Sequence, residues 1–132
     1  MQYTSYLQRF KSDETGSYSV EAALWLPIFT LIIALTIDVS SMYHKQSQIS
    51  LAVNEANRAY ATGRYLSLPE VETHVRSEMG LSAANAAITT SREGEYVLTQ
   101  VSVPSKDLMT MKFFDAFNPV DVAVAYRQLV EW

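Results

Sequence analysis

The sequence contains no cysteine and only four glycines in 132 residues. Disulfides, thiolate metal sites and cysteine nucleophiles are therefore excluded, and the sequence has no glycine-rich phosphate loop. Basic residues are also few: ten lysines and arginines stand against fourteen acids, so the net charge is −4 and the isoelectric point is near 5.1. Nucleic-acid binding usually needs a basic face, so we predict no nucleic-acid partner.

Patterns typical of catalytic sites are missing as well. His44 and His74 are far apart in the chain, and their spacing matches no metal-ligand motif. No Gly-x-Ser-x-Gly elbow occurs, and no triad can be assembled from the pattern. We therefore predict that the protein is not an enzyme and that it needs no metal or other cofactor.

The sequence does have one dense apolar block near its N-terminus. No charged residue occurs between Glu21 and Asp38, and with its flanks this stretch reaches about 20 residues, roughly what a bilayer core requires. Pro27 lies inside it and is tolerated in membrane helices, usually with a kink. We predict a transmembrane helix at 17–39, with Asp38 at the outer membrane–water boundary. A buried core helix is the alternative.

Beyond Asp38 the sequence is polar but keeps a helical period, and Gly63 follows as a C-terminal cap. We expect one continuous helix from about Val20 to Thr62, with a transmembrane first half and an amphipathic second half outside the membrane at 40–65. The apolar stripe of the second half consists of Met42, Ile49, Val53, Ala56 and Tyr60.

A second, short helix follows. The segment from Ser67 to Glu70 has the pattern of a capping box, in which Ser67 caps the helix and Glu70 reaches back. Gly80 ends the helix, and Glu72 and Arg76 are expected to pair along it. Its apolar face is Val71, Val75 and Met79.

The apolar period then changes to two, which is typical of strands. A tight hairpin turn is expected at Glu93-Gly94-Glu95. Together with the helical faces, the strands predict an α+β head at 66–132 with a small antiparallel three-stranded sheet. The expected strands are 87–92, 96–103 and 120–127.

The segment Leu108–Phe117, between the second and third strands, is expected to be a packed loop or a short helix. Its methionines and phenylalanines are interpreted as core packing, with an exposed contact patch for another subunit as the alternative. These side chains are Met109, Met111, Phe113, Phe114 and Phe117.

A polar segment, residues 1–16, precedes the apolar helix and is expected to be a cytoplasmic leader peptide. Glu21 at the edge of a membrane helix is costly, so it needs a compensating partner. A cut after Gly16 would place the new α-ammonium group of Ser17, largely protonated at neutral pH, one helical turn from Glu21. The cut would also remove the two leader cations that hold this end in the cytoplasm.

The stretch from Asp13 to Pro27 resembles the TadE/TadG-like family, minor pseudopilins of the tight-adherence (Tad, or Flp) pilus system. The shared features are the acidic pair before glycine, the Val-Glu, the Leu-Trp-Leu-Pro and the Asp38 that closes the apolar run. The resemblance covers residues 9–65.

This resemblance implies that a prepilin peptidase cuts after Gly16. Ser17 would then be the mature N-terminus, and Glu21 the glutamate at mature position five. Ala22 stands where an aromatic residue commonly follows that glutamate, which argues against the abundant shaft subunit. The expected function is assembly or initiation of a Tad/Flp-type pilus.

By the same resemblance the protein is single-pass in the bacterial inner membrane, with a cytoplasmic N-terminus and a periplasmic head, and incorporation into the pilus is a further option. Charge counting hardly decides this orientation, since the two cations before the span, Arg9 and Lys11, are matched by the two that follow it most closely, Lys45 and Arg58. The implied partners are the prepilin peptidase, other minor pseudopilins, the major pilin, the inner-membrane assembly platform and membrane lipid.

Two other functions remain open. The chain could be an unprocessed, membrane-tethered periplasmic interaction or sensor domain, or a secreted soluble domain released by signal peptidase at Val39-Ser40-Ser41. The N-terminus of the mature protein separates the three cases, because it would be Ser17 for a pilin, Met1 for a tethered domain and Met42 for a secreted one.

Overall fold

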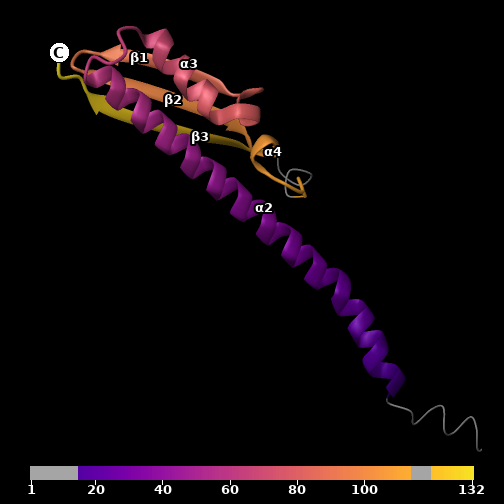
Figure 1. Ribbon diagram of the computed structural model, residues 1–132. Coiled ribbons are helices and arrows are strands. Elements are labelled where there is room, and N and C mark those ends of the chain that lie inside the picture. Colours follow the sequence, from indigo (N-terminus) through magenta and orange to yellow (C-terminus); the bar gives the residue numbers. More distant parts are fainter. Residues whose placement is uncertain (1–14, 114–119) are drawn as a thin grey trace, which may run out of the picture. The chain divides into compact units, whose positions relative to one another are not determined.

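The computed structural model describes residues 15–113 and 120–132. Contacts divide the chain into two compact units, Met1–Ala34 and Leu35–Trp132, and the second is called the head unit below. The expected α+β fold, with a long first helix, a short second helix and a three-stranded antiparallel sheet, is confirmed (Figure 1). Its elements are α2 (Thr15–Ala61), α3 (Leu68–Met79), the 3-10 helix η1 (Gly80–Ala83), β1 (Ala87–Glu93), β2 (Tyr96–Pro104), α4 (Ser105–Leu108) and β3 (Asp121–Leu129).

Helix α2 has 47 residues and is continuous. It begins at Thr15, earlier than the expected start near Val20, so the last residues of the predicted leader are helical. The acids Asp13 and Glu14 precede this end in the sequence, and negative charge near a helix N-terminus is favourable. The rest of the predicted leader, residues 1–14, lies outside the described residues.

The C-terminal end of α2 is a Schellman motif. Gly63 has a φ of 75°, which glycine adopts without steric cost. Its N–H bonds the carbonyl of Tyr60 at 3.0 Å, and the N–H of Arg64 bonds that of Ala59 at 2.8 Å. The predicted glycine cap is therefore confirmed.

The strands form an antiparallel meander in the order β1-β2-β3. Glu93 pairs with Tyr96 across a two-residue loop, and Gly94 at its first position has a φ of 63°, as a type II′ hairpin turn requires. The predicted turn is therefore confirmed. Alternation along β2 is strict, with Val97, Thr99, Val101 and Val103 all buried.

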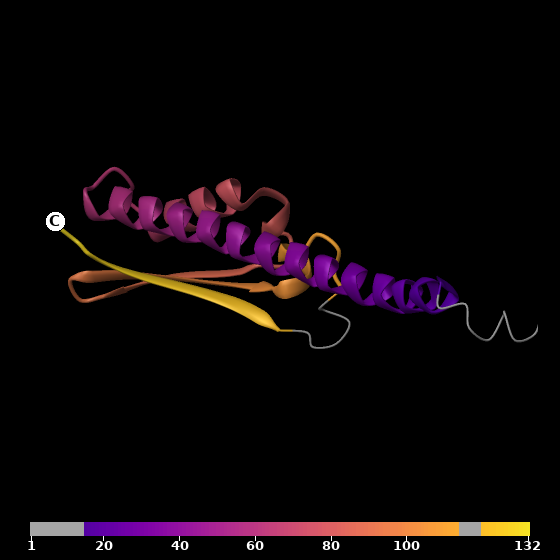
Figure 2. The same ribbon diagram turned by 90° about the horizontal axis from the view of Figure 1, so that it is seen from below.

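Within the head unit, α3 and the C-terminal half of α2 lie on the same face of the sheet (Figure 2). The predicted stripe of α2 is confirmed, since Met42 is partly buried in the core and the other four members are fully inside it. The predicted face of α3 is buried too. The core combines these stripes with inward residues of the strands, Leu108 of α4 and Val130 just after β3. The strand residues are Val97, Val101, Val103 and Val124.

Two predicted details of α3 are wrong. Ser67 is the N-cap residue, but its side chain makes no capping hydrogen bond, and Glu70 reaches one residue further back, accepting from the N–H of Leu66 at 3.0 Å. Glu72 and Arg76 do not serve as the expected pair, because each has a tertiary partner. Glu72 accepts from the N–H of Thr90, and Arg76 donates to the carbonyl of Ala83.

In the described part of the segment between β2 and β3, helix α4 is followed by the bend and turn residues 109–113. Met109 is buried in the head, whereas Met111 is exposed, so the interpretation as core packing is confirmed for Met109 and wrong for Met111. Phe113 is half-buried. The predictions for Phe114 and Phe117 lie outside the described residues.

Candidate functional site

The first half of α2 presents an apolar surface that is exposed among the described residues. It is long and apolar enough to cross a membrane, and none of its most apolar stretch is buried. A solvated helix of this kind would expose far more apolar surface than soluble proteins do. The exposed apolar side chains here include Leu24, Trp25, Leu26, Ile28, Phe29 and Ile32.

The three residues predicted to be used in processing and charge pairing lie together at the start of α2. Gly16 and Ser17 are in its first turn. Glu21 follows Ser17 by four residues and is exposed. On a helix, residues four apart are neighbours on one face. Ser17 and Glu21 are therefore one helical turn apart.

Pro27 lies within α2, where it removes one backbone donor. The Thr30 hydroxyl donates to the carbonyl of Leu26 at 2.9 Å, so this polar group in the apolar stretch has a partner on its own helix. Trp25 and Phe29 are in ring contact on the same turns, with centroids 5.9 Å apart.

Asp38 is fully buried in the head unit, with 0% of its surface exposed. Its two carboxylate oxygens accept the backbone N–H groups of Met111 and Phe113, each at 2.7 Å. Lys112, between these donors, has a left-handed φ of 57°. Successive N–H groups that converge in this way form an anion-binding nest, and Asp38 supplies the anion.

Two further α2 side chains hold the same segment. Ser41 shares a 2.8 Å hydrogen bond with the Thr110 hydroxyl, and the Lys45 ammonium group donates to the carbonyl of Asp107 at 3.1 Å. Together with Asp38 they form what we call the basal clasp: Asp38, Ser41 and Lys45 on α2 against residues 107–113. The spacing places the three side chains along one side of the helix.

The opposite end of the head unit is closed by Trp132. Its indole N–H donates to the carbonyl of Tyr60 at 2.8 Å, and the two rings are in contact with centroids 5.6 Å apart. The Arg92 guanidinium group lies 5.1 Å from the Trp132 ring centroid, a cation–π distance. This tryptophan therefore joins the end of α2 to β1.

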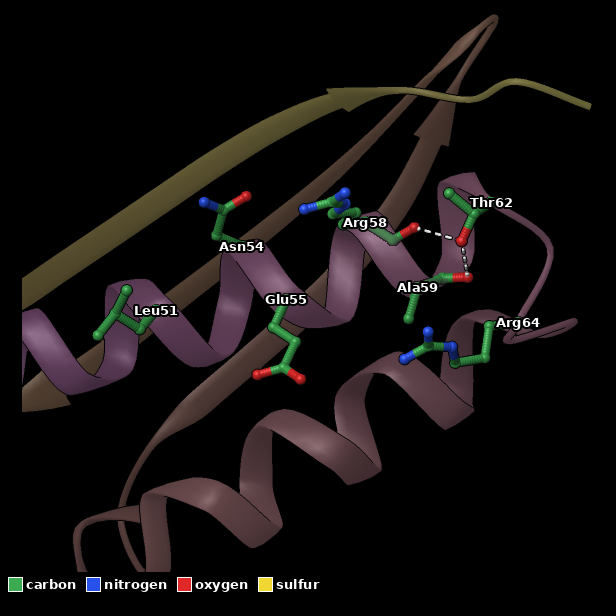
Figure 3. Close-up of a pocket in the computed structure, with 7 residues that line it drawn as sticks. All are labelled: Leu51, Asn54, Glu55, Arg58, Ala59, Thr62 and Arg64. Atoms are coloured by element: carbon green, nitrogen blue, oxygen red, sulfur yellow. Dashed lines mark hydrogen bonds between the residues drawn. The ribbon is translucent and has the colours of Figure 1, made fainter.

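The larger of two described pockets lies along α2 and has a volume of about 720 Å³ (Figure 3). Glu55, Arg58 and Arg64 give it both signs of charge. The Thr62 hydroxyl in its lining donates to the carbonyls of Arg58 and Ala59. Leu51, which is exposed, extends the lining toward the middle of α2.

The second pocket, of about 430 Å³, lies on the outer side of α3. His74 contributes to it and is in ring contact with Tyr65 at 5.7 Å between centroids. The buried Nε2 atom of His74 has no hydrogen-bond partner. Across the described residues, no group of three or more histidine, aspartate or glutamate side chains could hold a metal ion.

Sequence reasoning missed the contacts of Asp38 and Trp132. The partners of Asp38 are more than 70 positions away, and no local pattern predicts such contacts. One signal was available for Asp38. If an acid lies on the side of a helix that packs against the fold, its buried charge needs a hydrogen-bonding or charged partner.

These features define a class of protein. A single long apolar helix is compatible with single-pass membrane anchoring, and its C-terminal part packs on a small α+β head. The family model described as TadE-like protein matches residues 16–58, which confirms the resemblance seen in the sequence. The chain is therefore similar to TadE-like proteins over this segment, which lies within α2, and the similarity supports a Tad pilus-related function. Comparisons with curated proteins and with solved structures find no match.

Proposed function

We propose that the chain is a TadE-like minor pseudopilin that takes part in the assembly or initiation of a Tad/Flp-type pilus. In this proposal a prepilin peptidase cuts between Gly16 and Ser17, and the protein is an assembly subunit rather than an enzyme. The observation that carries the proposal is the TadE-like match, which starts at Gly16 and lies within α2.

Glu21 has the central electrostatic role in this proposal. It is an exposed acid at the start of an otherwise apolar helix, where a charge entering lipid costs up to about 3 kcal/mol. The ammonium group created at Ser17 would compensate that charge. If the amine and acid belong to neighbouring subunits, the pair also sets the axial register between their helices.

The proposed location is the bacterial inner membrane, with the N-terminus in the cytoplasm and the head unit in the periplasm. Removal of the leader takes away Arg9 and Lys11, and with them the charges that oppose movement of the helix out of the bilayer. The proposed partners are the prepilin peptidase, other minor pseudopilins, the major pilin and the inner-membrane assembly platform.

The basal clasp weighs against release by signal peptidase. A cut at Val39-Ser40-Ser41 would remove Asp38 and Ser41, and with them three of the hydrogen bonds that hold residues 110–113. The nest around Lys112 would lose its anion. The pseudopilin proposal keeps these contacts, because its cut lies at the other end of the apolar helix.

The test is mass spectrometry of the N-terminus of the protein purified from its native cell. We expect a start at Ser17, and a start at Met1 or Met42 would contradict the proposal. Gly16→Asp should leave the leader attached. Ser5→Asp is the matched control, because it adds the same charge to the leader away from the bond, and it should be processed normally.

A further inference from the structure

The turn Met111-Lys112-Phe113 is held at one defined level of α2. Two hydrogen bonds from the turn end on Asp38, each at 2.7 Å, and Asp38 is the first charged residue after the charge-free run 22–37. The turn and the end of the apolar run are therefore at the same height along the helix. We call these three residues the basal turn.

The composition of the basal turn suits a lipid headgroup region. Met111 is 58% exposed, Lys112 is exposed, and Phe113 is half-buried. Lysine can bury its alkyl stem in apolar surroundings while its ammonium group reaches phosphate oxygens. On this tight turn the exposed methionine can make an apolar contact with lipid and the lysine a charged contact with phosphate.

We infer that the basal turn lies in the headgroup region of the outer leaflet and forms a second membrane contact of the head unit, beside the helix itself. The inference rests on the proposed single-pass anchoring. The headgroup region is roughly 5–8 Å deep on each side of the hydrocarbon core, comparable to the reach of a methionine or lysine side chain.

Asp38 is the positioning residue for this contact. Two backbone N–H groups satisfy its carboxylate, so it can lie near lipid without an unpaired charge. The same bonds hold Lys112 in a left-handed conformation that an L-residue rarely adopts. Ser41 and Lys45 hold the residues before the turn, whereas the Asp38 carboxylate binds the turn itself.

The chain has no cysteine, so single-cysteine variants carry a spin label at one position only. We would label Met111→Cys, Leu66→Cys and Ile32→Cys in the full chain, reconstituted in phosphatidylethanolamine–phosphatidylglycerol vesicles. Label depth follows from the relative accessibility to oxygen and to a water-soluble nickel complex. Leu66 is the control, because it is 75% exposed and follows the end of α2, about 35 Å along the helix from Asp38.

The expected result is a label at Ile32 within the hydrocarbon, a label at Met111 in the headgroup region and a label at Leu66 in water. Equal nickel accessibility at Met111 and Leu66, with Ile32 in lipid, would overturn the inference and leave the proposed anchoring intact. A water-exposed label at Ile32 would overturn both.

Asp38→Asn combined with Met111→Cys tests the positioning role. The label should become several-fold more accessible to the nickel complex, because the turn loses one of its two acceptors. Asp121→Asn in the same background is the control and should leave the depth unchanged. An unchanged depth in the Asp38→Asn variant would show that the carboxylate does not set the height of the turn.

Discussion

The Thr99 hydroxyl donates a 2.6 Å hydrogen bond to Oδ1 of Asn57, 42 positions earlier in the chain. The amide of Asn57 also donates to the carbonyl of Tyr126 at 3.1 Å, so one buried side chain joins α2 to β2 and β3. Thr99 shares a bond with Thr90, whose N–H donates to Glu72 on α3. A network of hydrogen bonds between polar groups thus links α2 and α3 to all three strands.

Asn57→Ala is expected to destabilise the head unit by about 2–4 kcal/mol, because the buried Thr99 hydroxyl would lose its acceptor and the part-buried Tyr126 carbonyl would lose this donor. Hydrogen exchange of the β2 amides in micelles measures the loss. Asn54→Ala, one turn earlier and only partly buried, should change the stability by less than about 0.5 kcal/mol. Equal exchange in the two variants would contradict the role of Asn57.

The local elements of the head were predictable because they depend on near neighbours in the sequence. The alternation along β2 and the glycine at Gly94 determine a strand and a turn without help from the rest of the fold. The partners of polar side chains were not predictable. The spacing of Glu72 and Arg76 suits an ion pair along the helix, but each binds a backbone group that tertiary packing brings close. An exposed ion pair contributes too little to stability to compete with these hydrogen bonds.

The same distinction applies to the candidate site. Gly16, Ser17 and Glu21 could be selected from sequence because their relationship is local, within two turns of one helix. Asp38 could be identified as the end of the apolar run, but not as the anion of a nest, because the donors belong to a turn that follows the second strand.

Trp132→Phe tests the cap on α2. Phenylalanine keeps a ring against Tyr60 but lacks the indole donor, so we expect a loss of about 1 kcal/mol. Trp132→Ala also loses the contacts with Tyr60 and Arg92, and should cost about 2–3 kcal/mol, less than a core tryptophan because Trp132 is 54% exposed. Exchange of the amides at the end of α2 measures both. Trp25→Phe, in the apolar half, should leave these amides unchanged.

Glu21→Gln separates processing from assembly. The substitution keeps the shape of the side chain and removes the charge that would meet the Ser17 amine, so cleavage after Gly16 should proceed. Incorporation into pili should fall about tenfold, the effect of losing about 1.4 kcal/mol per contact. Immunoblots of sheared pili and membranes measure the two steps. Normal incorporation of the processed variant would rule out the charge pair.

Asp38→Asn is expected to weaken the basal clasp selectively. Asparagine keeps one acceptor oxygen, but its NH₂ group would face the N–H of Met111 or Phe113, so one hydrogen bond becomes a contact between two donors. Bonds to a carboxylate contribute about 1.5–3 kcal/mol each, so the amides of Met111 and Phe113 should exchange about tenfold to a hundredfold faster in micelles.

The amides of β2 report whether this effect is local. Asn57 and Thr99, which hold β2, share no hydrogen-bond partner with the basal clasp. Because sites without shared partners act nearly independently, hydrogen exchange of the β2 amides should change much less than exchange of the Met111 amide. Asp121→Asn, an exposed acid at the start of β3, is the charge-matched control and should alter neither region. If β2 and the clasp loosened equally in Asp38→Asn, the buried carboxylate would be supporting the whole head unit rather than one turn.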